Sequence, residues 1–353
     1  MMIKQLTFIG GISLKRNVYG GETIKNKIFL NYISHAYPKI DLSVIDTFDW
    51  KNRSSNLIYQ IATFFLDKKR KVLILSVSER GASIFFKAMR LFFWVKKDIY
   101  YFITGTVPDD FIAELPILLK GNRRPQLIFS EIEKQKVKIE AKNLPPVIHI
   151  SNWKYYNFIP ATIKKEYPVS KLKVFTFSKI DEAKGTSIFF ESLKIINRDG
   201  VKIEADLYGI IDESYRSTFE NYLSDAHYCQ FKNTIDLFKE ENYEILSRYD
   251  LMVFPTYHKG EGFAGTIIDC FIAGVPVVAS RWNYNGEIID DGVNGYLFEA
   301  KSVEALVNIL TAAYENQENL NLLRKNCVEE ARKYKIDIQL KSLLPKIVGD
   351  RTI

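Results

Sequence analysis

The sequence has 353 residues, of which 47% are hydrophobic and 14% aromatic, enough for two globular domains and unlike the composition of a disordered chain. It contains no apolar run of about 18 residues, the length that a membrane-spanning helix requires, and no N-terminal secretory signal. Three widely spaced cysteines form neither a metal-binding motif nor a disulfide framework, which favours a cytoplasmic protein.

Charge is distributed unevenly along the chain. Residues 1–160 contain 25 Lys and Arg against 13 Asp and Glu, a net charge of +12, whereas the remainder contains 24 against 29, a net charge of −5. This basic half indicates either an anionic partner or a lysine-rich genome. No RNA- or DNA-binding motif accompanies the charge, so we expect no nucleic-acid partner.

In the first half of the chain, short apolar runs alternate with helical patterns, as in parallel βα units. We expect strands at 2–9, 41–46, 71–77, 99–104, 127–130 and 147–150, and helices at 22–35, 54–69 and 81–95. This alternation predicts a doubly wound parallel sheet in an N-terminal Rossmann-like domain over residues 1–160.

A second βα series predicts a similar C-terminal domain over 161–330, after a linker at 151–170. Its expected strands are 174–177, 203–208, 227–231, 251–254 and 276–279, and its expected helices are 185–198, 213–223, 234–247, 265–273 and 302–315. A long charged helix is expected at about 319–347, and its end, residues 331–353, could cross back to the first domain. The predicted fold class is therefore α/β, with two doubly wound parallel-sheet domains that face a cleft.

The strongest functional pattern follows the expected strand at 251–254. A polar loop with Gly262 and Phe263 leads into a helix that begins near Gly265 and Thr266. Ligands of parallel α/β sheets bind beyond the carboxyl ends of the strands, where the free N–H groups of a helix N-terminus attract anions. Glycines allow the backbone to approach a ligand closely. We therefore predict a diphosphate site at this helix N-terminus.

Two acidic residues accompany this site. Asp269 lies near the start of the helix, where a carboxylate can accept hydrogen bonds from both ribose hydroxyls, and Glu261 lies in the loop, where it can reach a sugar. Glu261-x7-Asp269, followed by the Gly-Val-Pro-Val-Val segment at 274–278, resembles the signature of retaining glycosyltransferases of family 4, which have the GT-B fold. The resemblance implies that Glu261 contacts the donor sugar and Asp269 the ribose, although the family has a longer Glu at the second position.

A further stretch resembles the same family. Phe175–Gly185 is similar to the family's Gly-Arg-Leu-x-x-x-Lys-Gly, whose Arg and Lys neutralise the donor diphosphate. The resemblance carries these roles to Lys179 and Lys184, where two cations would replace a metal ion at the leaving phosphate. The alternative is that both are solvated surface lysines.

The N-terminal half offers weaker signals. Gly20 and Gly21 resemble the family's glycine-rich loop near the donor phosphates, or they form an ordinary turn before a helix. Many family members carry a His after the fourth strand, but here Thr104 and Gly105 stand at that place and are expected to line the cleft. Asn152 resembles the end of the family's first domain.

Two further features of the sequence each allow two interpretations. His258, beside the donor loop, is either a polar contact of the donor or only a part of the loop structure. The aromatic and basic run 83–97 is either an interfacial membrane helix or a core helix with its flanking strand. The basic cluster at 68–71 adds to the membrane interpretation.

Together these observations predict a retaining, metal-independent glycosyltransferase that requires no cofactor beyond its nucleotide-sugar donor, of UDP or GDP type. We expect the N-terminal domain to bind the acceptor and the C-terminal domain to bind the donor. The resemblance suggests a glycan or lipid-linked acceptor, bacterial cell-surface polysaccharide synthesis, and a location in the cytoplasm or peripherally on the inner face of the membrane. The alternative is a non-catalytic GT-B-like subunit that binds a nucleotide sugar and supports another transferase.

Overall fold

The computed structural model describes residues 5–14, 20–48, 54–67, 72–92, 94–160, 164–341 and 343–348. The chain divides into two compact units. The first contains the residues up to Tyr155 together with those from Lys335 onward, and the second contains Tyr156–Tyr334. The division therefore falls after Tyr155, where the sequence analysis placed it after residue 160.

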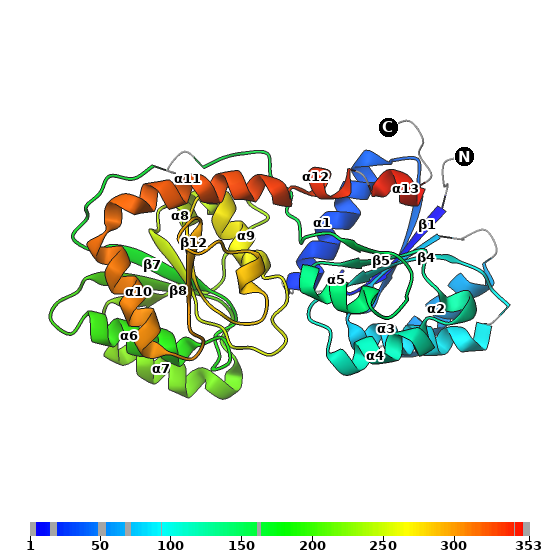
Figure 1. Cartoon of the computed structure of the whole chain (residues 1–353), viewed down its shortest axis with the longest axis horizontal. Helices are drawn as coiled ribbons and strands as arrows, with labels where there is room; N and C mark the ends of the chain where they lie inside the picture. Colours follow the sequence, from blue (N-terminus) through cyan, green and yellow to red (C-terminus); the bar gives the residue numbers. More distant parts are fainter. Residues whose placement is uncertain are drawn as a thin grey trace. The chain divides into compact units, whose positions relative to one another are not determined.

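The first unit is built on a six-stranded parallel sheet with the strand order β2-β1-β3-β4-β5-β6 (Figure 1). Its strands are β1 (Gln5–Gly10), β2 (Asp41–Asp46), β3 (Val72–Val77), β4 (Asp98–Ile103), β5 (Leu127–Ser130) and β6 (Val147–His149). Every residue of the central strand β3 is buried, which explains its uninterrupted apolar sequence.

Helices cover both faces of this sheet (Figure 1). They are α1 (Gly21–Ala36), α2 (Ser54–Leu66), α3 (Glu79–Ala88), α4 (Asp109–Leu118), α5 (Glu133–Glu140), α12 (Ile336–Leu340) and α13 (Leu344–Val348). Apolar side chains of α1, α12 and α13 share one core with the sheet, whereas those of α2, α3 and α4 share the other. The chain end thus contributes to the core of the first unit.

The second unit repeats the architecture with the strand order β12-β11-β10-β7-β8-β9, again all parallel. Its strands are β7 (Leu172–Phe177), β8 (Ile203–Tyr208), β9 (Cys229–Phe231), β10 (Leu251–Phe254), β11 (Val277–Ser280) and β12 (Gly295–Phe298). Its helices are α6 (Thr186–Ile196), α7 (Arg216–Asp225), α8 (Glu241–Ser247), α9 (Gly265–Ile272), α10 (Val303–Glu315) and α11 (Leu320–Ala331). Figure 1 shows α6, α7 and α10 on one face and α8, α9 and α11 on the other.

Several expected helices differ from the structure, and the one expected at 81–95 ends at Ala88. The helix expected at 234–247 begins only at Glu241, because the Asp236 side chain accepts a hydrogen bond from the backbone N–H of Phe238 (3.0 Å) and holds a turn. The single helix expected at 319–347 is broken after Ala331. There the backbone N–H of Ile336 bonds to the carbonyl of Lys154 (3.0 Å) instead of continuing the helical ladder.

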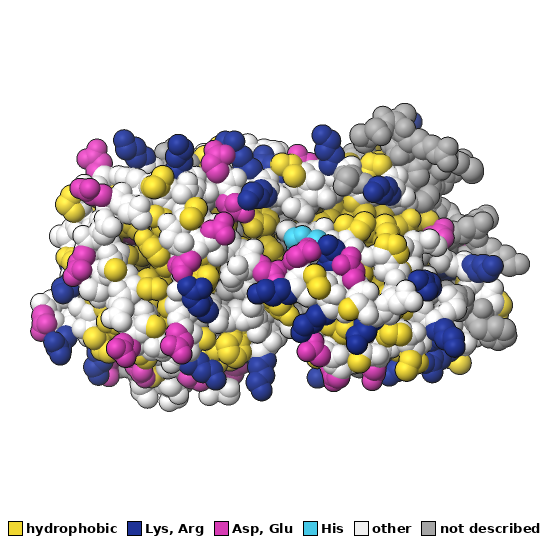
Figure 2. Space-filling view, viewed as in Figure 1, with side chains coloured by type: hydrophobic (Ala, Val, Ile, Leu, Met, Phe, Trp, Pro, Cys, Tyr) yellow, Lys and Arg dark blue, Asp and Glu magenta, His cyan; other side chains and the backbone are white. Residues whose placement is uncertain are grey.

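The aromatic run 83–97 is neither one surface helix nor wholly core. It contains the end of α3, the 3-10 helix η1 (Met89–Phe92) and the turn before β4. Phe85, Phe86 and Met89 are buried, whereas three large apolar side chains are more than half exposed: Ile84, Leu91 and Trp94. Figure 2 shows hydrophobic side chains beside lysine and arginine side chains around these helices.

One basic residue of that run lies inside the unit. Lys97 is buried and donates hydrogen bonds to the carbonyl oxygens of Phe64 (2.9 Å) and Asp67 (2.7 Å). It therefore adds nothing to a basic surface. The cluster at 68–71 lies outside the described residues. Within the described part of the chain, no helix is both long and apolar enough to cross a membrane.

A backbone contact in the second unit holds the loops after β7 and β10 together. Gly185 precedes α6 with φ +78°, and a Cβ atom there would lie 2.1 Å from the carbonyl oxygen of Pro255. The backbone N–H of Tyr257 also donates to the carbonyl of Ala183 (2.9 Å). Only glycine fits this position, because both its φ and its lack of a side chain are required.

We therefore predict that Gly185→Ala destabilises the second unit more than Gly292→Ala does. Gly292 has almost the same φ, +79°, but open space around its Cβ position. Both variants carry the left-handed strain of about 1–2 kcal/mol, and only Gly185→Ala adds an overpacking cost of about 1–3 kcal/mol. Urea denaturation followed by tryptophan fluorescence measures the difference. Equal losses in the two variants would show that the contact is not tight.

Candidate active site

Two loops of the second unit bring the predicted donor-site residues together. The loop after β7 carries Lys179 and Lys184, and the loop after β10 carries Glu261. Because β7 and β10 are neighbouring parallel strands, both loops emerge at the same edge of the sheet.

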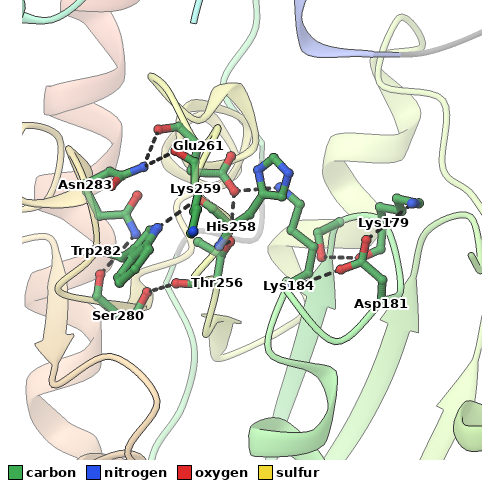
Figure 3. A network of polar contacts seen from close by, with 12 residues as sticks. Lys179, Asp181, Lys184, Thr256, His258, Lys259, Glu261, Ser280, Trp282 and Asn283 are labelled. Carbon is green, nitrogen blue, oxygen red and sulfur yellow. Dashed lines mark hydrogen bonds and ion pairs between the residues drawn. The ribbon is translucent and has the colours of Figure 1, made fainter. Parts of the chain in front are cut away.

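Lys184 and Glu261 form the centre of the site (Figure 3). The Lys184 ammonium lies 2.5 Å from Oε2 of Glu261, and the two side chains are only 17% and 12% exposed. The Thr256 hydroxyl donates a hydrogen bond to the same carboxylate oxygen (2.9 Å). The backbone N–H of Lys184 donates to Asp181 (2.9 Å), which fixes the start of the lysine side chain. A cation and a carboxylate are thus held side by side at the sheet edge.

Further residues fix the Glu261 loop, and the sequence analysis assigned them no role. Thr256 is fully buried, and its carbonyl accepts a hydrogen bond from the Ser280 hydroxyl. The Asn283 amide donates to the carbonyl oxygens of Lys259 (3.1 Å) and Glu261 (3.0 Å). Ser280 ends β11 and Asn283 lies in the loop that follows it, so no local pattern around Glu261 could have identified these two partners.

Glu182 links the two loops a second time. Its carboxylate accepts hydrogen bonds from the hydroxyls of Tyr257 (2.6 Å), Ser187 (2.8 Å) and Tyr215 (3.1 Å). Burial alone would raise the pKa of Glu182, but the three hydroxyls stabilise the charged form and lower it below its usual value. The carboxylate is therefore a fixed anchor beneath the loop that carries Lys184.

Lys179 does not join the Lys184–Glu261 pair. Figure 3 shows its side chain turned away from Lys184. Its ammonium, on a side chain that is 49% exposed, pairs with Asp212 and with Asp181 (3.3 Å). The hydrogen bond to Asp212 raises the pKa of Lys179, and the same bond lowers the pKa of Asp212 to about 2. The two lysines expected to form one clamp are therefore separate in this structure.

His258 supports the loop mainly through its backbone. Its carbonyl oxygen accepts hydrogen bonds from the Trp282 indole (2.8 Å) and from the backbone N–H of Glu261 (3.1 Å). Its ring lies against Gly260, where a Cβ atom would be 2.9 Å from the imidazole. These contacts support the interpretation of His258 as part of the loop structure. Its contact with a donor stays a prediction.

The helix expected at 265–273 is α9, which begins at Gly265 beside this loop. Asp269 is 3% exposed and accepts a hydrogen bond from the hydroxyl of Tyr243 (2.8 Å), a residue of α8 that is itself buried. Burial raises the pKa of Tyr243 well above its usual value, and the nearby Asp269 charge adds to this. The sequence analysis did not identify Tyr243 as part of the site, because it lies 26 residues away from Asp269 in the chain.

The other residues predicted around α9 differ in exposure. Gly262, Gly265 and Thr266 are half-buried and lie at or next to the helix N-terminus. The Phe263 side chain is buried and packs against Tyr334, with ring centroids 5.7 Å apart, so that only its backbone could face a ligand.

The predicted residues of the first unit lie at the carboxyl edge of its sheet. Gly20 and Gly21 are exposed at the start of α1, where Thr23 caps the helix by bonding to Gly20 (2.9 Å). Thr104 and Gly105 follow β4; Thr104 is 6% exposed, and Gly105 has φ +75°. Asn152 is buried and accepts a hydrogen bond from the backbone N–H of Trp153 (2.8 Å).

The chemistry available in the second unit is that of an anion and hydroxyl site. The Lys184 ammonium and the free N–H groups of α9 can stabilise negative charge. The carboxylates of Glu261 and Asp269 can accept hydrogen bonds from hydroxyls. Among the described residues, no group of three or more His, Cys, Asp or Glu side chains is placed to hold a metal ion.

Comparisons with known proteins identify the family of the second unit and the fold. Residues 161–334 match the family model described as Glycosyl transferases group 1. An uncharacterized glycosyltransferase of Methanocaldococcus jannaschii is 28% identical over 127 residues, which are 36% of this chain and 30% of that protein. The chain thus matches less than a third of that relative's length.

Two solved structures resemble the whole chain. HepE of Anabaena, solved in complex with UDP and glucose, has a TM-score of 0.72 at 14% identity and covers 99% of this chain and 100% of its own. Sucrose-phosphate synthase of Thermosynechococcus elongatus has a TM-score of 0.75 at 13% identity and covers 98% of this chain and 99% of its own. At these identities the likeness shows the fold. Residues 161–334 therefore form a domain of the glycosyl transferases group 1, and the two parallel six-stranded sheets with flanking helices form the GT-B fold.

Proposed function

We propose that the protein transfers a sugar from a UDP-linked donor to a hydroxyl group of a glycan or lipid-linked acceptor, with retention at the anomeric carbon. The observation that carries this proposal is the Lys184–Glu261 pair beside the N-terminus of α9. UDP is preferred to GDP because HepE, similar over its whole length, was solved with UDP and with UDP-glucose.

Donor binding would rearrange this pair. The diphosphate would lie at the N-terminus of α9 and take the Lys184 ammonium as its counter-ion, because a phosphate carries more charge than a carboxylate. Glu261 would then lose its ammonium partner but keep the Thr256 hydroxyl (2.9 Å), and its carboxylate could accept a sugar hydroxyl. The ion pair in the structure thus keeps both charged groups compensated until the donor arrives.

In the reaction the acceptor oxygen forms a bond to the anomeric carbon on the same face from which the bond to the phosphate oxygen breaks. The acceptor proton passes to the leaving phosphate. Lys184 and the N–H groups of α9 stabilise the charge that develops on that phosphate. Lys179 could contribute only if its ammonium leaves Asp212. The protein then acts mainly by positioning and charge stabilisation.

Glu261→Ala and Asp269→Ala are predicted to affect different kinetic constants. The ribose is unchanged in the reaction, so its contact with Asp269 is largely uniform binding, and Asp269→Ala should chiefly raise the donor KM. The transferred sugar gains oxocarbenium character, so Glu261→Ala should chiefly lower kcat. Each loss should be about 1.5–3 kcal/mol, the value of a hydrogen bond to a charged group.

Binding of UDP and of 2′-deoxy-UDP provides the matched readout. The wild type should prefer UDP, Asp269→Ala should lose this preference, and Glu261→Ala should keep it. Glu318→Ala, an exposed position of the same unit, is the control and should match the wild type. Unchanged transfer by both site variants would refute the site assignment. A wild type that binds UDP-sugar but never transfers or hydrolyses it would support the non-catalytic subunit instead.

Catalysis is also proposed to need no divalent metal and no further cofactor, since Lys184 and α9 supply positive charge at the diphosphate. We expect transfer rates in EDTA to stay within about twofold of those without it, whereas a metal essential to the transition state would contribute several kcal/mol. Complete loss of activity in EDTA, with recovery in magnesium or manganese, would contradict the proposal.

We also propose that the acceptor belongs to bacterial cell-surface polysaccharide synthesis. The protein would then act in the cytoplasm, at the inner face of the membrane. The exposed side chains of Ile84, Leu91 and Trp94 support a contact with an anionic bilayer, because the basic residues Lys87 and Arg90 are exposed between them. Apolar side chains that insert among headgroups, next to cations, are typical of interfacial segments.

The double variant Leu91→Ser/Trp94→Ser tests this contact. The wild type should float with vesicles that contain an anionic lipid at low salt, and much less with neutral vesicles or at high salt, because the cations are screened. The double variant should lose most of the floated fraction. Ile195→Ser, which removes an apolar side chain of the second unit that is 53% exposed, is the control and should float normally. Equal recovery of all three proteins would exclude the contact.

A further inference from the structure

The amino edge of the first sheet, at the opposite end of the strands from the predicted ligand-binding loops, carries two arginines that we call the arginine pair. Arg90 lies in η1, which precedes β4, and Arg123 ends the 3-10 helix η2 (Gly121–Arg123), which precedes β5. Because β4 and β5 are neighbouring parallel strands, the segments that lead into them lie at the same edge of the sheet.

The guanidinium group of Arg123 is anchored at one of its nitrogens only. Its Nε donates a hydrogen bond to the carbonyl oxygen of Lys120 (3.0 Å), in the turn that follows α4. Its Nη1 is buried and has no hydrogen-bond partner among the described residues. Buried polar groups are normally satisfied, and a charged donor is costly to leave without an acceptor. The Nη1 therefore points to an acceptor that the chain itself does not supply.

Arg90 adds a second positive charge at this place. Burial lowers the pKa of Arg123, and the charge of Arg90 lowers it further, so the two groups lie close enough to repel each other. Neither forms an ion pair with a described residue. Asp98, which begins β4, accepts a hydrogen bond from Gln126 instead (3.2 Å). The undescribed residues 68–71, which come before β3 in the chain, are Lys, Lys, Arg and Lys and offer no carboxylate. An anion bound to both arginines would relieve their repulsion.

Exposed apolar side chains share this edge with the arginine pair. Leu91 and Trp94 follow Arg90 in the chain, Ile117 lies in the last turn of α4, and all three are more than half exposed. The helices α3 and α4 lie on the same face of the sheet and both run from its carboxyl edge to its amino edge, so both end here (Figure 1). A free anion gains nothing from apolar neighbours, whereas the phosphate of a lipid headgroup is attached to apolar chains. The edge therefore fits a phosphate at a bilayer surface.

We propose that the arginine pair is a binding site for the phosphate group of an anionic lipid headgroup. This inference rests on the proposed membrane contact and adds a defined site to it. Guanidinium groups bind phosphate oxygens through paired, charge-assisted hydrogen bonds, which a lysine cannot form in the same geometry. Attraction between a basic surface and a charged bilayer needs no such site and depends only on the number of cations near the surface. The two cases therefore differ in whether the identity of the arginine matters.

The test has two arms, both with the full chain. In the first, glycerol 3-phosphate is titrated in the presence of saturating UDP, which occupies the proposed donor site, and binding is followed by phosphorus NMR. In the second, the floated fraction is measured with vesicles of phosphatidylcholine that contain phosphatidic acid. The wild type should bind in both arms. Arg90→Gln and Arg123→Gln should each weaken both interactions at least about tenfold, the effect of one lost hydrogen bond between charged groups.

Arg124→Gln is the matched control, because it removes the same charge at the next residue, whose side chain is exposed. It should leave glycerol 3-phosphate binding unchanged and weaken vesicle binding at most about fivefold, the effect of one surface cation near an anionic bilayer. Equal losses in Arg123→Gln and Arg124→Gln, or no binding of glycerol 3-phosphate by the wild type, would overturn the site. A difference between them with glycerol 3-phosphate but not with vesicles would overturn its assignment to a lipid.

Two further measurements separate this proposal from the proposed function. UDP affinity should match the wild type in every arginine variant, which shows that each protein is folded. Failure of the wild type to bind UDP would refute the proposed donor function and leave the phosphate arm to be judged in its own terms. If Leu91→Ser/Trp94→Ser loses flotation while Arg90→Gln and Arg123→Gln float like the wild type, the membrane contact stands and the headgroup site is refuted.

Discussion

The parallel direction of the strands in the described residues is the constraint on which the candidate site depends. In a parallel sheet every strand ends at the same edge, so loops that are distant in the chain meet there. Lys184 and Glu261, 77 residues apart, become an ion pair because β7 and β10 are neighbours. Lys25 and Glu131, 106 residues apart, meet in the same way across the first sheet. The buried strands themselves carry no chemistry and only fix where the polar loop residues lie.

Solvent exposure distinguishes the two lysines of the second unit. Water screens the Lys179 ammonium, because its side chain is 49% exposed, so its pairs with Asp181 and Asp212 are surface ion pairs of small net value. Lys184 is 17% exposed and faces the Glu261 carboxylate, which is 12% exposed, so water screens the attraction between them less. For the same reason, it would cost more free energy to leave either charge unpaired. A diphosphate that replaced Glu261 at Lys184 would therefore interact more strongly than one at Lys179.

The strands expected at 41–46, 127–130, 203–208 and 251–254 have the expected bounds. Those at 127–130 and 251–254 are short, almost wholly buried apolar runs, whereas β8 alternates between buried and half-buried residues and β2 is mostly half-buried. The helix expected at 234–247 was wrong in its first part, because the Asp236 side chain accepts a hydrogen bond from the backbone N–H of Phe238 there. Lys97 belongs to the run 83–97, and nothing near it in the sequence indicates that its ammonium donates hydrogen bonds to the carbonyl oxygens of Phe64 and Asp67.

The candidate site was predictable as far as its residues are local. Glu261, Asp269 and Lys184 were predicted from local motifs and from the resemblance of these motifs to a family signature, and their roles stay predictions. The hydrogen-bond partners of these residues are distant in the chain. Tyr243 contacts Asp269 through the packing of α8 on α9, and Asn283, in the loop after β11, donates to the carbonyl of Glu261. Side-chain networks of this kind depend on tertiary distances, which sequence spacing does not contain.

Tyr243 also bears on the meaning of the shorter acid at position 269. A carboxylate on a shorter side chain has less reach, and by itself the change from Glu to Asp would suggest a weakened site. In this chain the phenol of Tyr243 fills the adjacent space and donates to Oδ1, and both residues are 3% exposed, so the carboxylate has a single orientation. A fixed acceptor loses less conformational entropy when a ligand hydroxyl binds, and this offsets part of the lost reach. The Asp is thus part of a packed polar pair, and its shorter side chain is by itself no argument that the chain is non-catalytic.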